Sequence, residues 1–334
     1  MLILGIETSC DDAAAAVFET DRAGSGKIRS SAVANQDDIH RLYGGIVPEL
    51  ASRNHVVTMV PIIERAMAEA GCHLADIGAI AVTRGPGLVG SLLVGLMCAK
   101  GLAQATGIPF VGVNHIEGHL LAPLLEHAIA MPYLALVVSG GHTSLFVVED
   151  FGRYRRLGST RDDAAGEAFD KVAKLMGLGY PGGKIIDDIS KRGNRKAVQI
   201  PRARLKNSPM DFSFSGVKTA VANFLRSEAG AATSGEDLAA SFQEAVVDML
   251  IRPTLAGAHA TGADTVALTG GVAANSRLRE RLTQALQAEN RRVVAPALQY
   301  CTDNAAMIAM AGSYRLLRGE SDCLDLDAEA NLSL

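Results

Sequence analysis

Two histidines, His115 and His119, lie four residues apart. They follow an apolar run at 109–113 and precede a leucine-rich segment at 120–125, a pattern that predicts a strand, a turn and a helix. Residues four apart on a helix share a face, so the two imidazoles could bind one metal ion. The alternative is a pair of surface or capping histidines, and the spacing alone leaves both interpretations open.

The spacing invites comparison with the His-Glu-x-x-His helix of metallopeptidases, where a glutamate after the first histidine is the general base. Here the nearby acid is Glu117, midway between the histidines. At about 100° per residue, Glu117 lies roughly opposite their face, so the pair predicts a metal site without that base. Asp303, which could also simply cap the closing helix, is a candidate third ligand.

Short turns rich in glycine and hydroxyl groups form a second set of candidates. They lie at 8–12, 139–143 and 268–275, each directly after an apolar strand pattern. Glycine permits close approach to backbone N–H groups, and a following helix N-terminus favours anions. One such turn is weak evidence, but three predict nucleotide or phosphate binding. Asp170, on a helix expected to begin at about Asp163, could bind ribose hydroxyls.

The turns at 8–12 and 139–143 each separate two apolar strands, at 2–18 and 133–148. This repeat suggests an internal duplication and two related lobes, each with α/β character. The length of 334 residues also favours two domains. The 34 glycines suit an α/β protein with many strand-to-helix turns.

Composition narrows the cellular setting. The five cysteines are scattered without a Cys-x-x-Cys pair, which is typical of reduced thiols in a cytoplasm. We find no run of 18 apolar residues, so no membrane association is expected. The net charge of −4 excludes a strong global attraction to nucleic acid but not a local basic patch. Such a patch is predicted at 191–206, which carries seven cations and no acid, and we expect it to contact RNA phosphates.

Taken together, the motifs closely resemble the tRNA N6-adenosine threonylcarbamoyltransferase family of the bacterial TsaD type, formerly described as a glycoprotein endopeptidase. They span nearly the whole chain in the family's order. Lys184, where the family often has proline, and Ser144, often glutamine, depart from the pattern without removing a key group. The matching motifs are Gly5–Asp12, Asn114–His119, Val138–Thr143, Asp162–Lys171, Tyr180–Gly183, Phe212–Thr219, Gly270–Asn275 and Thr302–Ala309.

The resemblance implies a two-lobed, actin-like ATPase fold of the Hsp70 and sugar kinase type, with the active cleft between the lobes. The expected N-terminal lobe is 1–110 joined by helix 304–318, the C-terminal lobe is 111–303, and 319–334 is a poorly ordered acidic tail. His115, His119 and Asp303 would hold one Fe²⁺ or Zn²⁺, and Mg²⁺ could accompany a nucleotide. The implied ligands of threonylcarbamoyl-AMP are Val137, Val138, Ser139, Gly140, Gly141, Asp170, Gly183, Asp187 and Asn275.

The implied reaction moves the threonylcarbamoyl group to N6 of the adenosine 3′ of the anticodon, in tRNAs reading codons that begin with A, and releases AMP. The implied partners, besides tRNA, are a TsaB-like paralogue and a TsaE-like ATPase in the cytoplasm. We expect the helix at Pro48–Ala70 to bind the paralogue. Three alternatives stay open: a small-molecule kinase of the same fold, a zinc metallopeptidase, and a non-enzymatic nucleotide-dependent scaffold.

Overall fold

The computed structural model describes residues 1–21 and 26–334. The chain forms two compact units, Met1–His127 with Gln299–Leu334, and Ala128–Leu298. These limits differ from the predicted divisions at 110/111 and 303/304. The reason lies in strand pairing, because the strand at Phe110–Asn114 completes the sheet of the first unit and carries the histidine helix with it.

The first unit is built on a five-stranded mixed sheet with the order β3-β2-β1-β4-β5. Consecutive strands β1, β2 and β3 run antiparallel, whereas β4 pairs in parallel with β1 and β5 with β4. The predicted hairpin at 2–18 is confirmed as β1 and β2. The strands are β1 (Leu2–Glu7), β2 (Ala13–Thr20), β3 (Gly26–Ala34), β4 (Ile77–Gly85) and β5 (Phe110–Asn114).

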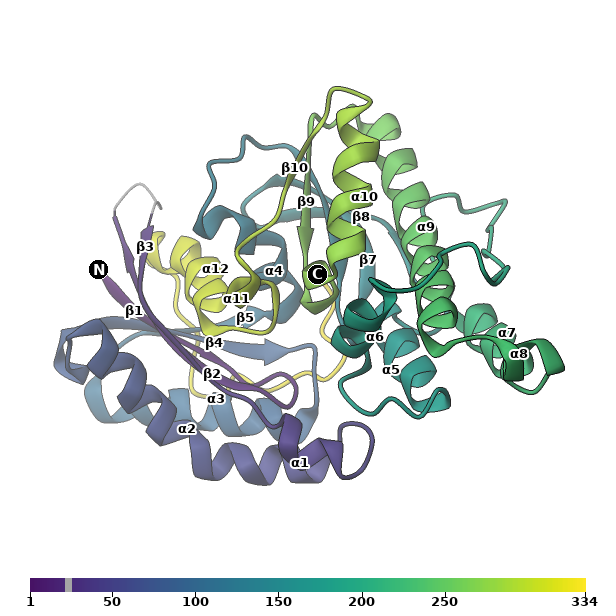
Figure 1. Ribbon diagram of the computed structural model, residues 1–334. Helices are drawn as coiled ribbons and strands as arrows, with labels where there is room; N and C mark the ends of the chain where they lie inside the picture. Colours follow the sequence, from purple (N-terminus) through teal and green to yellow (C-terminus); the bar gives the residue numbers. More distant parts are fainter. Residues whose placement is uncertain (22–25) are drawn as a thin grey trace. The chain divides into compact units, whose positions relative to one another are not determined.

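Helices cover both faces of this sheet, which explains why its strands are apolar on both sides. In Figure 1, α2 and α3 lie together on one face and α12 on the other. Gly5 in β1 permits the close packing of α12, because a Cβ there would strike the carbonyl oxygen of Ala305. The helices are α1 (Asp37–Arg41), α2 (Pro48–Ala70), α3 (Val89–Thr106), α4 (His115–Leu121), α11 (Leu298–Cys301) and α12 (Ala305–Leu317), with short 3₁₀ turns at Leu74–Asp76 and Ala122–Leu125.

One helix in the described part of the chain, α3, is long and apolar enough by length and composition to cross a membrane. It packs against β4 and α2, and Leu92, Leu96 and Ala99 are fully buried. A helix with one face in the core of a protein passes the same test of length and composition, so α3 is weak evidence for a membrane span. The helix begins at Val89, and Ser91 is buried inside its first turn.

The C-terminal segment 319–334 belongs to the packed first unit, so the expectation of a poorly ordered tail is wrong. The Asp322 carboxylate accepts a hydrogen bond from the Gly112 N–H group at 2.7 Å, and the backbone of Glu329 bonds to that of Arg84 at 2.8 Å. Leu326 packs against the core. The Asp322 carboxylate thus satisfies a backbone donor of β5, and the Glu329 N–H group satisfies a backbone carbonyl of β4, which composition alone does not reveal.

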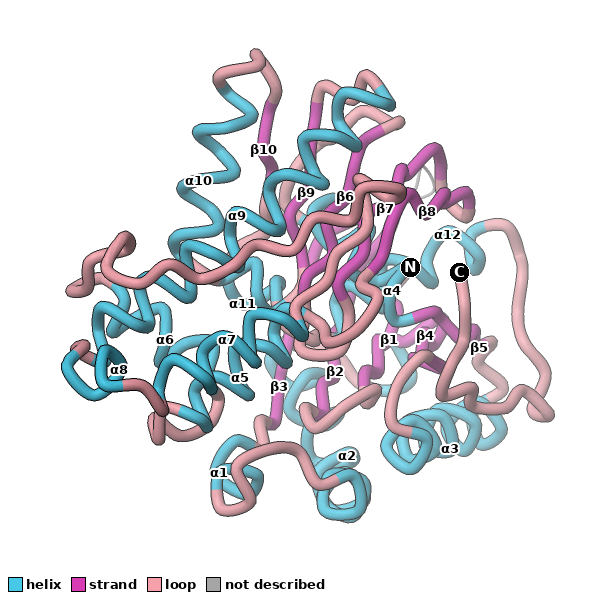
Figure 2. The backbone as a smooth tube through the Cα atoms, turned by 90° about the vertical axis from the view of Figure 1, so that its right-hand side faces the viewer, coloured by secondary structure: helices cyan, strands magenta, loops and turns pink. Residues whose placement is uncertain are grey.

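The second unit repeats the topology of the first. Its sheet has the order β10-β9-β6-β7-β8, with β6, β7 and β8 antiparallel, β9 parallel to β6 and β10 parallel to β9. Figure 2 shows β9, β6 and β7 as neighbouring strands of this sheet. The duplication predicted from the two hairpins is thereby confirmed. The strands are β6 (Tyr133–Val138), β7 (Thr143–Asp150), β8 (Arg153–Ser159), β9 (Thr265–Thr269) and β10 (Arg292–Val294).

The long helix α9 is the core helix of the second unit, and Leu238, Phe242, Val246 and Met249 are buried along it, as its periodicity predicts. Helix α5 begins one residue later than expected, so Asp163 does not cap it but pairs with two lysines nearby. The helices are α5 (Ala165–Leu175), α6 (Gly182–Ser190), α7 (Ser215–Leu225), α8 (Glu228–Ala232), α9 (Gly235–Thr261) and α10 (Ser276–Gln287), with a 3₁₀ turn at Gly271–Ala274.

Candidate metal centre and glycine-rich binding turns

The two histidines are held on the short helix α4, directly after β5. Asn114 caps this helix, and its side-chain oxygen accepts hydrogen bonds from the N–H groups of Ile116 at 2.8 Å and Glu117 at 3.4 Å. His115 and His119 therefore point the same way from successive turns, with ring centroids 4.6 Å apart, and both are buried. The surface-histidine interpretation is thus wrong for this pair.

Asp303 joins the histidines, as predicted. One of its carboxylate oxygens lies 3.2 Å from Nε2 of His119 and 3.6 Å from Nε2 of His115. Ligand atoms of the three residues all lie within 4.8 Å of one another. The cap of α12 is Asn304, whose side chain accepts from the Met307 N–H group at 3.0 Å. Neither Thr302 nor Asp303 caps this helix, and the Asp303 carboxylate is available to face the imidazoles.

Glu7, which we did not predict as a site residue, lies behind His115. It is fully buried and accepts hydrogen bonds from the Ser9 N–H group and the Thr83 hydroxyl, each at 2.5 Å. Its second oxygen lies 3.1 Å from Nδ1 of His115, and the Ser9 hydroxyl lies 3.1 Å from the same nitrogen. An acid at the end of an otherwise apolar strand was the signal that could have revealed it, because buried carboxylates need partners.

The electrostatics of this cluster shift the pKa values of its members. Burial opposes a charged His115, but the attraction of Glu7 and Asp303 outweighs burial and raises the pKa of His115 to about 9. Burial, with a smaller contribution from the charge of His115, lowers the pKa of His119. The pKa of Glu7 is lowered because its contact with His115 outweighs the effect of burial. Glu7 accepts the Nδ1 proton of His115, so the Nε2 atom of the same ring is the one that faces Asp303.

The donor set fits a transition metal. Two imidazole nitrogens and one carboxylate oxygen are ligands that suit Zn²⁺ or Fe²⁺. Two ring nitrogens share a single carboxylate oxygen as their neighbour. Nδ1 of His119 is also buried without a hydrogen-bond partner among the described residues. The nitrogen of His119 that faces Asp303 is Nε2, so the metal interpretation rests on the donor set and its geometry.

The turn after β6 in the second unit is open where the predicted ligands lie. Ser139 closes it, because its backbone N–H donates to the His142 carbonyl at 2.7 Å and its hydroxyl accepts from the His142 N–H group at 3.1 Å. At Gly140 and Gly141 a Cβ would meet no described atom within 4 Å, and neither residue has the positive φ that favours glycine. Neither tight packing nor a positive φ requires glycine at these two positions. A ligand lying against the backbone would require it.

Two other predicted ligands cannot act through their side chains. Val137 and Val138 are fully buried core residues of β6. Only their backbone groups remain as candidates, and the Val138 carbonyl lies so close to Gly270 that a Cβ on Gly270 would strike it. Their expected role in binding is therefore restricted to shaping the turn that follows.

The remaining predicted ligands are joined to the Ser139 turn by one chain of hydrogen bonds. The Gly166 N–H of α5 donates to the Ser139 carbonyl at 3.2 Å, and Asp170 of α5 accepts from the Gly182 N–H of α6 at 2.8 Å. Asp187 of α6 then accepts from the hydroxyl of Ser276 at 2.9 Å, at the start of α10. The second unit thus brings the predicted turn and helix N-termini together.

The side chains in this chain of bonds mainly hold the turns. Asn275 caps α10 by accepting from the Leu278 N–H at 2.9 Å, and its amide group donates to Gln243 at 2.8 Å. Gly183, by contrast, has open space around it, the nearest atom to a Cβ being that of Phe169 at 4.0 Å. The groups left for a ligand are therefore the glycine backbones and the N-termini of α6 and α10.

The duplicated sheets define a two-unit α/β protein of the actin-like ATPase fold, and its first unit carries a His-His-Asp cluster. Full-length HypF in its phosphate- and nucleotide-bound form shares this fold, with a TM-score of 0.61 and 14% identity over 95% of this chain and 55% of HypF. So does the activator of the 2-hydroxyisocaproyl-CoA dehydratase from Clostridium difficile with bound ADPNP, with a TM-score of 0.54 and 15% identity over 97% and 99% of the two chains.

The chain belongs to the tRNA N6-adenosine threonylcarbamoyltransferase (TsaD) family, whose model matches residues 27–310. Relatives of that name include proteins of Syntrophotalea carbinolica, 50% identical over 100% of this chain and 97% of theirs, and Pelobacter propionicus, 52% identical over 99% and 96%. The Clostridium botulinum relative is 49% identical over 99% and 97%. The resemblance drawn from the motifs is confirmed, and the kinase, metallopeptidase and scaffold alternatives are set aside.

Proposed function

We propose that the protein transfers a threonylcarbamoyl group from threonylcarbamoyl-AMP to N6 of the adenosine 3′ of the anticodon, in tRNAs reading codons that begin with A. The observation that carries this proposal is membership of the transferase family over almost the whole chain. The co-location of His115, His119 and Asp303 supports it, because this cluster has no evident task in a kinase.

The glycine-rich turns of the second unit bind the adenylate. Gly140, Gly141 and Gly183 leave their backbones open to a ligand, and the N-termini of α6 and α10 favour a phosphate. Asp170 and Asp187 keep these helix ends in place through Gly182 and Ser276. The donor is therefore held largely by backbone N–H groups, which cost little reorganisation during the reaction.

The reaction requires no covalent protein intermediate, because a mixed carbonic–phosphoric anhydride is already activated. The N6 amine attacks the carbamoyl carbon, the bond from that carbon to the phosphate oxygen breaks, and AMP leaves with the electron pair while the amine loses a proton. Backbone N–H groups of the turns stabilise the charge that develops on the departing phosphate. Positioning of the tRNA amine supplies much of the remaining rate enhancement.

His115, His119 and Asp303 hold one Fe²⁺ or Zn²⁺ in this proposal. When bound, such an ion acts as a Lewis acid that can polarise a carbonyl or hold a phosphate. Glu7 keeps the proton of His115 on Nδ1, and Ser9 and Thr83 keep Glu7 in place. These residues orient the ligand and do not themselves contact substrate.

A transfer assay tests the proposal. The protein, with TsaB-like and TsaE-like partners, receives radiolabelled threonylcarbamoyl-AMP and a tRNA that reads codons beginning with A. We expect label in the anticodon loop, and none with His115→Ala or Asp303→Ala. Absence of label with folded, metal-loaded protein would overturn the transferase assignment. Phosphate transfer from ATP to a metabolite would then favour the kinase alternative.

We also propose that one face of the first unit binds the TsaB-like paralogue. Val56, Val57 and Val60 on α2 are 68%, 72% and 56% exposed, and α3 beside it exposes further apolar side chains, Val89, Leu93 and Met97. Several exposed apolar side chains on two neighbouring helices are typical of a protein interface. Met59, on the same helix, is 2% exposed and belongs to the core, so it is not part of this face.

This interface is tested by charge substitution on the exposed face only. Val57→Glu and Val60→Glu should abolish co-purification with the paralogue while leaving the unfolding temperature nearly unchanged. Leu298→Glu, at a residue that is 60% exposed and lies outside α2 and α3, is the matched control. An intact complex with both α2 variants would exclude this face.

A further inference from the structure

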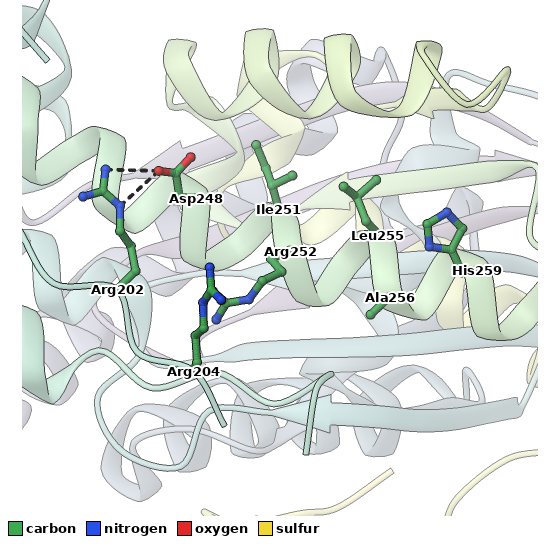
Figure 3. A pocket seen from close by; sticks show the side chains of 8 residues that line it. All are labelled: Arg202, Arg204, Asp248, Ile251, Arg252, Leu255, Ala256 and His259. Carbon is green, nitrogen blue, oxygen red and sulfur yellow. Dashed lines mark hydrogen bonds and ion pairs between the residues drawn. The ribbon is translucent and has the colours of Figure 1, made fainter. Parts of the chain in front are cut away.

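The densest group of cations in the second unit lies along α9. Arg202 and Arg204, from the segment that precedes α7, and Arg252 of α9 line a cavity of about 620 Å³. In Figure 3, Arg202 is bonded to Asp248, whereas Arg204 and Arg252 lie side by side. An adjoining cavity of about 490 Å³ shares Arg202 and Asp248 with the first. The two cavities adjoin at the Arg202–Asp248 pair, and we call them together the groove.

Charge within the groove is poorly balanced. Asp248 is the acid that lines the first cavity, and its carboxylate is already shared by Arg202 and Arg281, at 3.1 Å from each. Arg204 forms no ion pair with any residue that the structure describes. Burial and then the charge of Arg204 lower the pKa of Arg252. Like charges held this close, without a carboxylate between them, favour a bound anion.

The second cavity extends this positive surface. It is lined by Arg195 and Lys196 and by two arginines of α10, Arg277 and Arg281. Glu244 partly neutralises it, because both arginines of α10 bond to that carboxylate. The groove nevertheless carries a clear excess of positive charge in a protein whose net charge is −4. A local potential of this kind can attract a polyanion that the whole molecule would repel.

The structure also distinguishes paired from unpaired cations in the basic segment 191–206, which we expected to contact RNA phosphates. Lys191 pairs with Asp188 at 2.8 Å, and Arg192 pairs with Glu236 at 3.3 Å, so these two cations at the start of the segment are neutralised. The later part, with Arg202 and Arg204, meets Arg252, a cation that the linear charge pattern did not connect to it. The expected phosphate contact therefore moves to the later part and to α9.

We propose that this groove binds the sugar-phosphate backbone of the tRNA substrate. The inference rests on the proposed function, and it names the docking surface that the function leaves open. Guanidinium groups match phosphate oxygens in pairs, and two adjoining cavities offer room for successive phosphates rather than one free ion.

The test is tRNA binding at several salt concentrations with charge-changing variants. We use Arg204→Glu alone and Arg204→Glu with Arg252→Gln, because Arg204 is exposed and tolerates reversal. Binding should weaken at least about tenfold at low salt, and the slope of log K against log salt should fall by about 1 for each lost contact. The matched control is Arg226→Glu, an exposed arginine at the end of α7, which should change neither quantity.

Transfer kinetics separate this proposal from the proposed function. The variants should raise KM for tRNA and leave kcat at saturating tRNA unchanged, because Arg204 and Arg252 are not among the residues assigned to the reaction. Unchanged tRNA affinity and salt slope in folded variants would overturn the groove even if the wild-type protein is an active transferase. Conversely, a wild-type protein without transfer activity would overturn the function, while direct tRNA binding still tests the groove.

A competition experiment distinguishes RNA from an acidic protein partner. Polyglutamate and unrelated tRNA are compared as competitors of labelled tRNA. Efficient competition by tRNA and weak competition by polyglutamate supports the proposal. If the variants lose polyglutamate binding but keep tRNA binding, the groove serves an acidic protein and the proposal is overturned.

Discussion

The first turn of each unit follows the same strand of the same topology, yet the two turns are closed in different ways. In the first unit, Ser9 donates its N–H group to the buried carboxylate of Glu7 at 2.5 Å. In the second unit, Ser139 donates its N–H group to the carbonyl of its own turn, His142, at 2.7 Å. One turn is organised around a buried charge and the other around its own backbone.

The way each turn is closed suits a different ligand, a metal ion in the first unit and a substrate in the second. The Glu7 carboxylate holds His115 in one orientation, which a metal centre requires. The self-closed turn leaves Gly140 and Gly141 exposed and open, which a transient substrate requires. A duplicated fold can therefore carry two chemistries when one acid at the strand end is replaced by an apolar residue, here Val138.

The largest effect is expected from removing a charge at the centre itself. Asp303→Asn keeps the shape of the side chain but removes the carboxylate shared by the two histidines. We expect metal affinity to fall more than about 100-fold, beyond the loss typical of an outer partner. Competition with a chelator measures this affinity, and metal content by mass spectrometry checks it. Affinity equal to that of the wild-type protein would show that Asp303 is not a ligand.

Glu7→Gln removes the buried charge that distinguishes the turn of the first unit from the turn of the second. The amide occupies the same volume but no longer provides a charged acceptor for the His115 Nδ1 proton. Metal affinity should fall by about 10–100-fold, the usual effect of an outer-shell partner. Thr83→Val removes one bond to Glu7 but leaves its contact with His115, and should therefore have a smaller effect. Equal losses in both variants would mean that Glu7 acts only by general packing.

The pH dependence of metal binding sharpens the same contrast. With a pKa of about 9, His115 is protonated in the metal-free protein at neutral pH and must lose a proton when it binds an ion. Apparent affinity should therefore rise about tenfold per pH unit up to about pH 9 and then level off. In Glu7→Gln the pKa of His115 should be lower, so the plateau begins at lower pH. Chelator competition across pH 6.5–10, a range chosen to bracket the His115 pKa, gives both curves; a flat wild-type curve contradicts the assigned pKa.

The sequence pattern predicted much of this architecture because its signals are local. Alternation of apolar runs and turns located the strands of both hairpins, and helical spacing placed His115 and His119 on one face. The roles of Glu7 and Asn304 were missed because each depends on a partner remote in sequence or on which of several polar residues takes the cap. The packing of the tail was missed for the same reason.

Glycine position was the other limit of sequence reasoning, because a pattern cannot separate glycines that the fold needs from glycines that a ligand needs. The structure does so within the second unit. Gly270 has a φ of 93° and would drive a Cβ into the Val138 carbonyl, whereas Gly141 has neither constraint. The two glycines belong to the same predicted class but differ in what surrounds them.

Alanine substitution of these two glycines should have different effects on stability and on ligand binding. Gly270→Ala should destabilise the protein by about 1–3 kcal/mol, because it combines backbone strain with a steric clash. Gly141→Ala should change the free energy of unfolding by less than about 0.5 kcal/mol, since its Cβ enters open space. The same substitution should weaken binding of a non-hydrolysable adenylate severalfold, because the Cβ occupies the space over the turn. Denaturant unfolding and calorimetric titration measure the two effects. If Gly141→Ala destabilises the fold as much as Gly270→Ala, the open turn is a structural requirement, and its assignment to the adenylate fails.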